Sequence, residues 1–510
     1  MKKYFLFTLN LFFSCFLFAQ TNETPTPQWR PDYHFTPLKN WTNDPNGLLY
    51  LNGVYELYNQ QNPYENIWGH MSWGHATSTD LVNWKHLPLA MPEGINNEDT
   101  TWRFSGSAVW DKNNTSGLCK DSGCIVVIYT ADQPHIKKES QYIAYSNDGG
   151  MSFINYFKNP VIDLNKKDFR DPNVQWNEQL NKWLMVVALP HENSVQFYSS
   201  PDLKNWELLS EFGNAGLQGG IWECPFFIQL PVEGTSEKKW VLANSFQDNA
   251  GNDLEEYYVG DFDGKTFTND NPAKTTLLLD NGNSLYASIP WNNLPDDQHT
   301  YIGWMVPEKQ ETYPWRGQMS IPRDLSLRNT NEGIRLFQNP AKKIKDNLSS
   351  LSKKMVSFEN LKVKGTLNNI LKDKDITSNS YWLQAELEVP KNTISGFKIA
   401  QQTDKSGNII SETVIGFDAS KNEVYVDRSG AGNGKINQMK LSQSMIVSPT
   451  NGKIKLEILF DKSSLEVFAN DGEKVLTTYI YPDEEANMLS AFSFGGESLI
   501  KSLKVWDMSK

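Results

Sequence analysis

A chain of 510 residues exceeds the size of one ordinary compact domain, so we expect two or three domains. The formal charge of −12, from 60 Asp and Glu against 48 Lys and Arg, argues against a nucleic-acid partner, because phosphates bind to basic faces. Aromatic residues make up 12% of the chain, and the 33 Gly and 25 Pro complete a composition typical of a β-rich protein with many turns rather than a helical one.

The N-terminus has the pattern of an export signal. Lys2 and Lys3 precede a mostly apolar run that ends at Ala19 and is too short for a comfortable membrane span. We therefore expect a signal peptide over residues 1–19 and a polar linker over residues 20–28.

Two conclusions about location follow from this pattern. We expect an exported protein, periplasmic or extracellular, with no membrane span, because no later stretch reaches the roughly 20 apolar residues of a spanning helix. A lipid anchor at Cys15 is the less favoured alternative, because the apolar run continues beyond that cysteine.

From Trp29 onward, short apolar and aromatic runs of strand length alternate with turn residues. A weak repeat is superimposed on them, since residues 78–84 and 200–206 agree at five of seven positions in the pattern S-x-D-L-x-N-W. Similar Asp turns occur at Asp148 and Asp263. The four turns, at Asp80, Asp148, Asp202 and Asp263, are therefore separated by 68, 54 and 61 residues. At about 60 residues per four-stranded blade, this spacing predicts a five-bladed β-propeller over residues 29–338.

The remaining residues follow another pattern. Residues 339–356 are rich in Lys and Ser and are predicted to be a connector. Apolar and polar residues then alternate strictly, as in residues 453–460, which is typical of strands with one buried face. We therefore predict an all-β protein, a five-bladed β-propeller followed by a C-terminal β-sandwich over residues 357–510.

The cysteines and histidines indicate no metal chemistry. Cys119 and Cys124 flank a short loop and could form a disulfide in an oxidising compartment, although two free thiols fit the sequence nearly as well. No CxxC pair occurs, and His70 and His75 are five residues apart, which is not the common HxxxH spacing. The sequence therefore predicts no metal site.

Three carboxylates occur in turn-like settings at the edges of predicted strands. Asp44 precedes Pro45, and Asp171 follows Arg170, which could hold a carboxylate ionised or bind a ligand rich in hydroxyl groups. Acidic residues also precede proline in many ordinary turns. The inner strands of a propeller converge on its axis, however, so carboxylates from different blades can meet there.

The third carboxylate, Glu223, lies between Trp222 and Cys224. We interpret these neighbours as an apolar setting that could raise the pKa of Glu223 and keep a proton on it for donation.

Five motifs, in order along the chain, resemble glycoside hydrolase family 32, which comprises invertases, inulinases, levanases and related fructosidases. They are WTNDPNG at 41–47, FSGS at 104–107, FRDP at 169–172, WECP at 222–225 and WRGQMSIPR at 315–323. The segment SLEVF at 464–468 is similar to the family's C-terminal signature, so the resemblance covers nearly the whole mature chain. It implies a five-bladed propeller followed by a sandwich.

The resemblance also implies catalytic roles for the three carboxylates. Asp44 matches the nucleophile that attacks the anomeric carbon of a β-fructofuranosyl unit, and Glu223 matches the acid/base. Asp171 matches the group that stabilises the transition state by binding sugar hydroxyls. In a retaining glycosidase the first two should lie about 5–5.5 Å apart and give a bell-shaped pH profile, and no metal or organic cofactor is needed.

Six further residues match positions that line the family's pocket for terminal fructose, where amides and guanidinium supply hydrogen bonds and aromatic rings supply apolar walls. They are Asn43, Gln60, Trp68, Phe104, Ser105 and Arg170. Trp68 and Phe104 could instead be core aromatics and Gln60 a surface residue, while Tyr286 and Trp315 are weaker candidates. Thr42 departs from the pattern, because many members have an apolar residue there.

The implied activity is that of an exported retaining glycoside hydrolase that releases fructose from β-fructofuranosides. Its expected partner is a fructan such as levan or inulin, or sucrose, with exo action on fructans favoured because the protein is exported. One alternative is a fructosyltransferase that uses the same carboxylates. Another is a non-catalytic carbohydrate-binding propeller, against which the three intact carboxylates argue.

Overall fold

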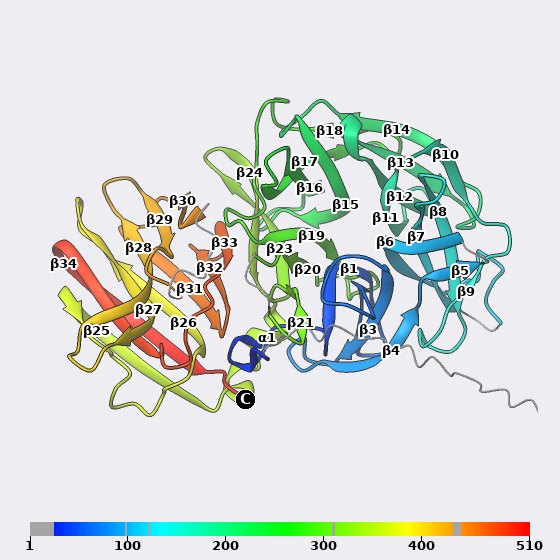
Figure 1. Ribbon diagram of the computed structural model, residues 1–510. Helices are drawn as coiled ribbons and strands as arrows, with labels where there is room; N and C mark the ends of the chain where they lie inside the picture. The colour runs from blue at the N-terminus through cyan, green and yellow to red at the C-terminus, as the bar shows by residue number, and fades with distance from the viewer. Residues whose placement is uncertain (1–24, 97–98, 121–122, 309–311, 432–439) are drawn as a thin grey trace, which may run out of the picture.

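The computed structural model describes residues 25–96, 99–120, 123–308, 312–431 and 440–510. Within them the chain forms two β-rich lobes that lie side by side, a propeller followed by a sandwich (Figure 1). The predicted fold class is therefore confirmed. The predicted signal peptide, with Cys15, and the linker up to residue 24 lie outside the described residues.

Five antiparallel blades make up the described propeller, and the inner strands of neighbouring blades contact one another in a closed ring, β1–β6–β11–β15–β19. In chain order the blades contain β1 (Asn40–Leu51), β2 (Val54–Gln61), β3 (Ser72–Ser78) and β4 (Lys85–Met91); β5 (Gly94–Asn96), β6 (Asp99–Asp111), β7 (Cys124–Gln133), β8 (Lys138–Ser146), β9 (Ile154–Asn155) and β10 (Ile162–Lys166); β11 (Arg170–Asn177), β12 (Lys182–Leu189), β13 (Ser194–Ser200) and β14 (Glu207–Gly213); β15 (Gly220–Pro231), β16 (Lys238–Asp248), β17 (Asp253–Phe262) and β18 (Phe267–Asn269); and β19 (Leu285–Pro290), β20 (Thr300–Met305), β22 (Gln318–Met319), β23 (Arg323–Thr330) and β24 (Gly333–Pro340). Two single-turn 3₁₀ helices, Pro27–Trp29 and Pro190–Glu192, accompany them.

The repeated Asp turns follow the third strand of their blades. In the first blade Asp80 Oδ1 accepts hydrogen bonds from the backbone N–H groups of Val82 and Asn83, at 2.9 and 2.7 Å. Asp202 binds Lys204 and Asn205 in the same way in the third blade, at 3.0 and 2.8 Å. An aspartate that bonds its own downstream backbone stabilises a tight turn, and this explains why the repeat is visible in the sequence.

The motif at 315–323 closes the ring of blades. Its strand β21 (Trp315–Arg316) pairs in parallel with the start of β1 in the first blade. Gly317 has φ of +87°, and a Cβ atom on it would lie 2.2 Å from the Thr42 carbonyl oxygen, so this close approach requires glycine. Trp315 is buried in a cluster with Trp29 and Met305 and is therefore a core residue rather than a wall of the pocket.

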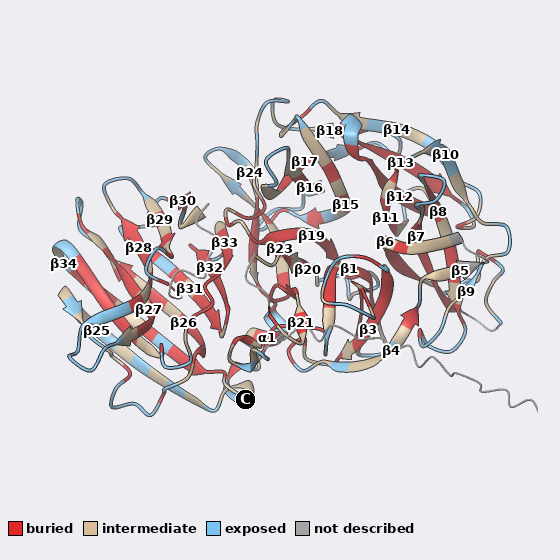
Figure 2. Cartoon of the chain, viewed as in Figure 1, coloured by how far each residue is buried: buried red, intermediate tan, exposed pale blue. Residues whose placement is uncertain are grey.

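The described C-terminal region is a ten-stranded arrangement built around one long strand. This strand, β34 (Met488–Asp507), pairs with β27 along its N-terminal half and with β26 along its C-terminal half. Strand β25 pairs with β34 along both halves. The strands are β25 (Lys354–Leu367), β26 (Ser380–Glu388), β27 (Ile394–Thr403), β28 (Ile409–Asp418), β29 (Glu423–Asp427), β30 (Ser442–Ile446), β31 (Lys453–Asp461), β32 (Ser464–Ala469), β33 (Lys474–Tyr479) and the long strand β34 (Met488–Asp507). The alternating residues of β31, including Ile454 and Leu456, lie in the sandwich core, and buried residues run along the strands of both lobes (Figure 2).

Between β24 and β25 the chain forms two short helices, α1 (Lys342–Lys345) and α2 (Leu348–Leu351). Ile344 and Leu348 from these helices pack in a hydrophobic cluster that contains residues of both domains, among them Tyr33 and Trp382. The segment that joins the domains is therefore part of their contact.

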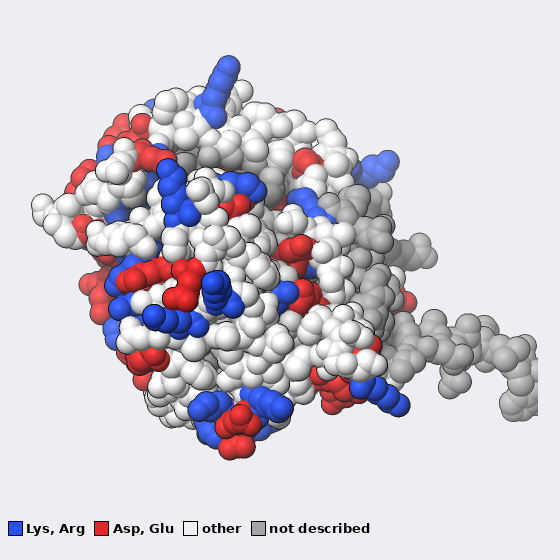
Figure 3. All heavy atoms as spheres, turned by 90° about the vertical axis from the view of Figure 1, so that its left-hand side faces the viewer, with Lys and Arg blue, Asp and Glu red and all other residues white. Residues whose placement is uncertain are grey.

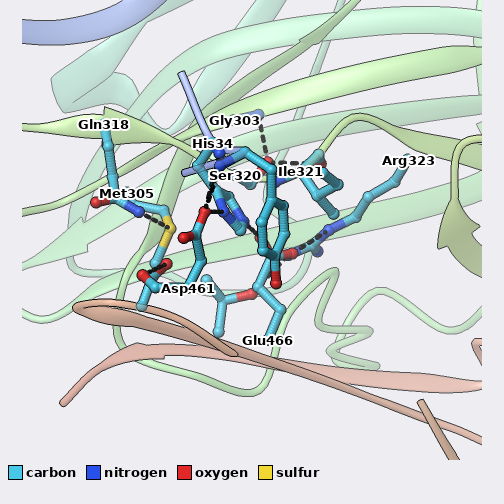
Figure 4. Close-up of polar contacts among 12 residues, drawn as sticks. His34, Gly303, Met305, Gln318, Ser320, Ile321, Arg323, Asp461 and Glu466 are labelled. Carbon is cyan, nitrogen blue, oxygen red and sulfur yellow. Dashed lines mark hydrogen bonds and ion pairs between the residues drawn. The ribbon is translucent and has the colours of Figure 1, made fainter. Parts of the chain in front are cut away.

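Polar groups buried at the same contact link three parts of the chain (Figure 4). The His34 ring lies between Asp461 and Glu466 of the sandwich, with nitrogen–oxygen distances of 2.8 Å to each. Arg323, at the end of the motif at 315–323, reaches Glu466 at 2.6 Å. Glu466 is the acidic residue of the SLEVF segment, so that signature serves the contact between the domains.

Three further observations concern the whole chain. Cys119 and Cys124 form a disulfide, and Cys224 is a free, buried thiol. Among the described residues no helix is long and apolar enough to cross a membrane. On the face formed by the sandwich, acidic and basic side chains are intermingled (Figure 3).

Candidate active site

The inner strand of every blade carries an irregularity in its pairing. The pairing register shifts between Thr42 and Pro45 in β1, and equivalent shifts occur in β6, β11 and β15 at predicted motifs and in β19 after Tyr286. A β-bulge turns side chains out of the regular alternation of a strand. Each motif therefore presents its polar residues at the axis instead of burying them within its blade.

A cavity of about 490 Å³ lies where these bulges meet. All three predicted catalytic carboxylates and all six predicted binding residues line it, although they come from five strands and one loop. These nine are Asn43, Asp44, Gln60, Trp68, Phe104, Ser105, Arg170, Asp171 and Glu223.

Asp44 is half-buried and is held by polar contacts. Its Oδ2 accepts a hydrogen bond from Ser105 Oγ at 2.5 Å and from Cys224 Sγ at 3.5 Å, while Oδ1 accepts one from Asn43 Nδ2 at 3.1 Å. Burial raises the pKa of Asp44, the Ser105 hydrogen bond opposes this rise, and the nearby negative charge of Glu223 adds to it. The carboxylate is therefore fixed in one orientation with little hydration.

Glu223 has polar rather than apolar contacts, which differs from the interpretation of its sequence neighbours. Arg170 Nε donates to Oε1 at 2.9 Å, and the Tyr286 hydroxyl donates to Oε2 at 2.7 Å. Trp222 is turned into the blade core, where its indole N–H donates to the Leu217 carbonyl. Alternation along β15 explains the difference, because adjacent residues of a strand face opposite sides.

Asp171 is the third carboxylate; it is buried and has a left-handed backbone at φ of +66°. Its Oδ2 accepts the backbone N–H of Cys224 at 2.9 Å, and its own N–H donates to Thr130 Oγ1 at 2.9 Å. Burial raises the pKa of Asp171 and the charge of Glu223 raises it further, while Arg170 opposes both effects. Cys224 thus contacts both Asp44 and Asp171, and its thiol stays protonated because burial raises its pKa.

Arg170 is surrounded by carboxylates. Besides Glu223, it binds Glu139 at 2.8 Å and Asp168 at 3.0 Å through Nη1. Glu139 also accepts the backbone N–H of Phe169 at 2.8 Å, so it holds both the side chain of Arg170 and the loop before it. Burial raises the pKa of Glu139 to about 7, against the opposing influence of Arg170.

The predicted binding residues complete the wall of the cavity. Gln60 Nε2 donates to Ser105 Oγ at 2.7 Å, and Gln60 Oε1 is buried without a hydrogen-bond partner among the described residues. Trp68 is 51% exposed and packs edge-on against Phe104, with ring centroids 6.1 Å apart. Thr42 does not face the cavity, because its hydroxyl donates to the Gln60 carbonyl and accepts from Asn59.

Several residues of the site were not among the predicted set. Tyr286, which the sequence offered only as a weak candidate, contacts Glu223 directly. Glu139 lies in none of the motifs, and it reaches Arg170 only because β8 packs behind the motif at 169–172. The other unpredicted residues of the cavity wall are Asp132, Pro134, Lys137, Lys167, Cys224, Gln247, Asp253, Trp304 and Val306. Among the described residues, no group of three His, Cys, Asp or Glu side chains is arranged to hold a metal ion.

Solved structures share this architecture over nearly the whole chain. The crystal structure of exo-inulinase from Aspergillus awamori is 33% identical and covers 94% of this chain and 98% of that one, with a TM-score of 0.85. The β-fructofuranosidase of Schwanniomyces occidentalis, solved with fructosyl-erythritol, is 30% identical and covers 96% and 99% of the two chains, also with a TM-score of 0.85. The protein is therefore of the propeller–sandwich glycosidase class.

Sequence comparison identifies the family. Residues 34–340 match the glycosyl hydrolases family 32 N-terminal domain, and residues 347–507 match the family 32 C-terminal domain. A levanase of Bacillus subtilis is 39% identical over 99% of this chain and 74% of its own length, and an extracellular exo-inulinase of Aspergillus ficuum is 36% identical over 92% of each chain. The chain belongs to glycosyl hydrolase family 32 and is a glycoside hydrolase, as the motifs predicted.

Proposed function

We propose that this protein is an exported, retaining β-fructosidase that removes terminal fructose from fructans. The observation that carries the proposal is the convergence of Asp44, Asp171 and Glu223 on one cavity from three inner strands. The names of the relatives support it, since they are levanases, exo-inulinases and fructofuranosidases.

The proposed roles follow from the contacts of each carboxylate. Asp44 attacks the anomeric carbon, because Ser105 and Asn43 orient it and favour its ionised form. Glu223 donates its proton to the leaving oxygen and then takes a proton from the water that releases fructose. Asp171, fixed by the Cys224 N–H, binds sugar hydroxyls as positive charge develops on the ring.

The pocket residues suit a terminal sugar unit. Gln60 Oε1 is a buried acceptor without a partner among the described residues, so a sugar hydroxyl can satisfy it. The five inner strands surround the cavity, which favours a chain end over the middle of a polymer. Exo action on β-2,6- or β-2,1-linked fructans is therefore the proposed specificity, with sucrose as a further substrate.

A pair of substitutions tests the roles. We expect Glu223→Ala to lower fructose release from levan, inulin and sucrose by at least about a hundredfold, because general acid–base catalysis is lost. With an aryl β-fructofuranoside, whose leaving group needs no protonation, azide should restore turnover of Glu223→Ala by attacking the fructosyl–Asp44 intermediate, which gives a β-fructosyl azide. In Asp44→Ala azide would replace the nucleophile itself, so any azide product should have the α configuration. Asp132→Asn, at a carboxylate of the same cavity with no proposed role, is the matched control and should keep most of its activity.

Three outcomes would contradict parts of the proposal. Unchanged fructose release by Glu223→Ala would overturn the assignment of the acid/base. A ladder of oligomers instead of free fructose from levan or inulin would overturn exo action. Longer oligosaccharides accumulating at high sucrose would identify the fructosyltransferase that uses the same carboxylates.

Export is proposed from Lys2, Lys3 and the apolar run that follows them. The extracellular exo-inulinase among the relatives supports it. N-terminal sequencing of the secreted protein should begin at Gln20, and a lipidated N-terminal cysteine would favour the anchor at Cys15 instead.

A further inference from the structure

A row of aromatic rings leads away from the cavity over the surface of the first two blades. Trp68, in the cavity wall, lies edge-on to Trp102 with ring centroids 5.2 Å apart. Trp102 lies 6.3 Å from the His70 ring, and His70 lies 5.3 Å from the Tyr64 ring. We call these four residues the aromatic row; only Trp68 belongs to the proposed fructose pocket.

The aromatic row is exposed although its side chains are large and largely apolar. Tyr64 is 61% exposed and Trp68 51%, and the neighbouring Ile67 is 53% exposed. Adjacent apolar side chains on a surface mark a binding site more often than isolated ones do. The packing of the blades does not require these rings to be exposed, because the buried core beneath them is filled by other residues, including Trp73 and Tyr129.

Buried hydrogen bonds hold the row in place. The fully buried Asn62 accepts the backbone N–H groups of Tyr64 and Glu65 through Oδ1, at 2.9 and 3.2 Å, and donates to the Ile67 carbonyl at 2.9 Å. His70 pairs with Glu93 at 3.0 Å. A surface that is already ordered loses little conformational entropy when a ligand binds.

We propose that the aromatic row is an extended binding surface for the sugar units of a fructan chain beyond its terminal residues. It is continuous with the cavity through Trp68, and its flat rings offer apolar faces while Tyr64 and His70 offer polar edges at the surface. A disaccharide has only one sugar beyond the fructosyl unit, whereas Tyr64 lies three ring contacts from Trp68. The row therefore selects polymers over sucrose; this inference rests on the proposed function.

The test compares substrates of different length. We expect Tyr64→Ala and Trp102→Ala each to lower kcat/KM for levan or inulin by about threefold to tenfold, the value of one aromatic contact. Tyr64→Ala should leave kcat/KM for sucrose unchanged, because Tyr64 does not line the cavity. In both variants the loss should grow with chain length across a series of fructo-oligosaccharides. Tyr64→Phe keeps the ring and should retain most of the polymer activity.

Phe157→Ala is the matched control, because Phe157 is an exposed aromatic residue, 83% exposed, that does not line the cavity. It should alter neither polymer nor sucrose hydrolysis, and unfolding temperatures should show that every variant folds. Equal losses on sucrose and polymer in Tyr64→Ala, or no loss on either, would overturn the proposed role of the aromatic row. Absence of fructose release by the unaltered enzyme from all these substrates would instead overturn the proposed function.

Discussion

At the scale of single residues, the site sets the protonation of Asp44 by opposing influences. Burial and the charge of Glu223 raise its pKa, while hydrogen bonds from Ser105, Asn43 and Cys224 lower it. If Asp44 is the nucleophile, as proposed, it must be ionised, so the acidic limb of the pH profile should lie above the ordinary pKa of an aspartate. The hydroxyl of Ser105 is the strongest of the lowering influences.

Replacing Ser105 by alanine should therefore move the acidic limb of the kcat/KM profile to higher pH. A hydrogen bond to a charged group contributes about 1.5–3 kcal/mol, which corresponds to a shift of about one pH unit or more. Ser199→Ala is the matched control, because Ser199 is buried in β13 and its hydroxyl has no partner among the described residues. An acidic limb that stays in place in Ser105→Ala would contradict the role given to this hydroxyl.

At the scale of elements, neighbouring strands brace the loops that carry the chemistry. Strand β8 contributes Glu139, which binds Arg170 and the backbone of Phe169, and Gln141, which donates to the Phe169 carbonyl at 2.7 Å. The motif at 169–172 is thus held by a strand of the preceding blade. We infer that Glu139 is a positioning residue, because it acts on Glu223 only through Arg170.

Glu139→Gln tests this bracing, since it keeps the shape but removes the charge. We expect kcat/KM to fall by about tenfold, the value of one hydrogen bond to a charged group. We also expect the loss to appear in kcat more than in KM, because Arg170, released from one carboxylate, no longer fixes the orientation of Glu223.

The control for this variant is Glu233→Gln, which removes one partner of an exposed pair with Arg328 in the same domain. Surface pairs contribute little, so activity and pH profile should not change. If Glu139→Gln merely lowered the unfolding temperature and left kcat unchanged, Glu139 would have a structural role only.

At the scale of the whole molecule, the elements that repeat were predictable and the contacts between them were not. Asp80 and Asp202 bond their own turns, so local sequence revealed the blades and their number. Asp44 and Glu223 were found because the family preserves their motifs. Glu139 and the bulges that direct the site residues inward depend on residues distant in sequence, and no local pattern encodes such pairings.

The contact between the domains is such a case. No pattern around His34 indicates its two carboxylate partners, Asp461 and Glu466, which follow more than 400 residues later. Burial alone would lower the pKa of His34, but the hydrogen bonds to these carboxylates outweigh it and raise the pKa to about 9. Protonated His34, with Arg323, supplies the positive charge that both buried carboxylates need.

This arrangement predicts how the stability of the two joined domains depends on pH. A group whose pKa is raised on folding stabilises the protein fully below its unfolded pKa, about 6.5 for histidine, and the contribution is lost as pH rises through about 9. The difference in unfolding free energy between the unaltered protein and His34→Gln should therefore shrink by about 3 kcal/mol between pH 6 and pH 10. Denaturant unfolding at each pH measures it.

At acidic pH the stability depends on pH in the opposite direction. The pKa of Asp461 and of Glu466 is lowered although burial opposes this, because His34 binds both and Arg323 binds Glu466. Their contribution to stability is therefore present above their unfolded pKa and is lost as pH falls through their folded pKa. Stability should thus be greatest between the two limits. The control is His191→Gln, at a histidine whose side chain is 61% exposed. Its unfolding free energy should change with pH in the same way as that of the unaltered protein. A constant difference for His34→Gln from pH 6 to pH 10 would show that the charge of His34 does not join the domains.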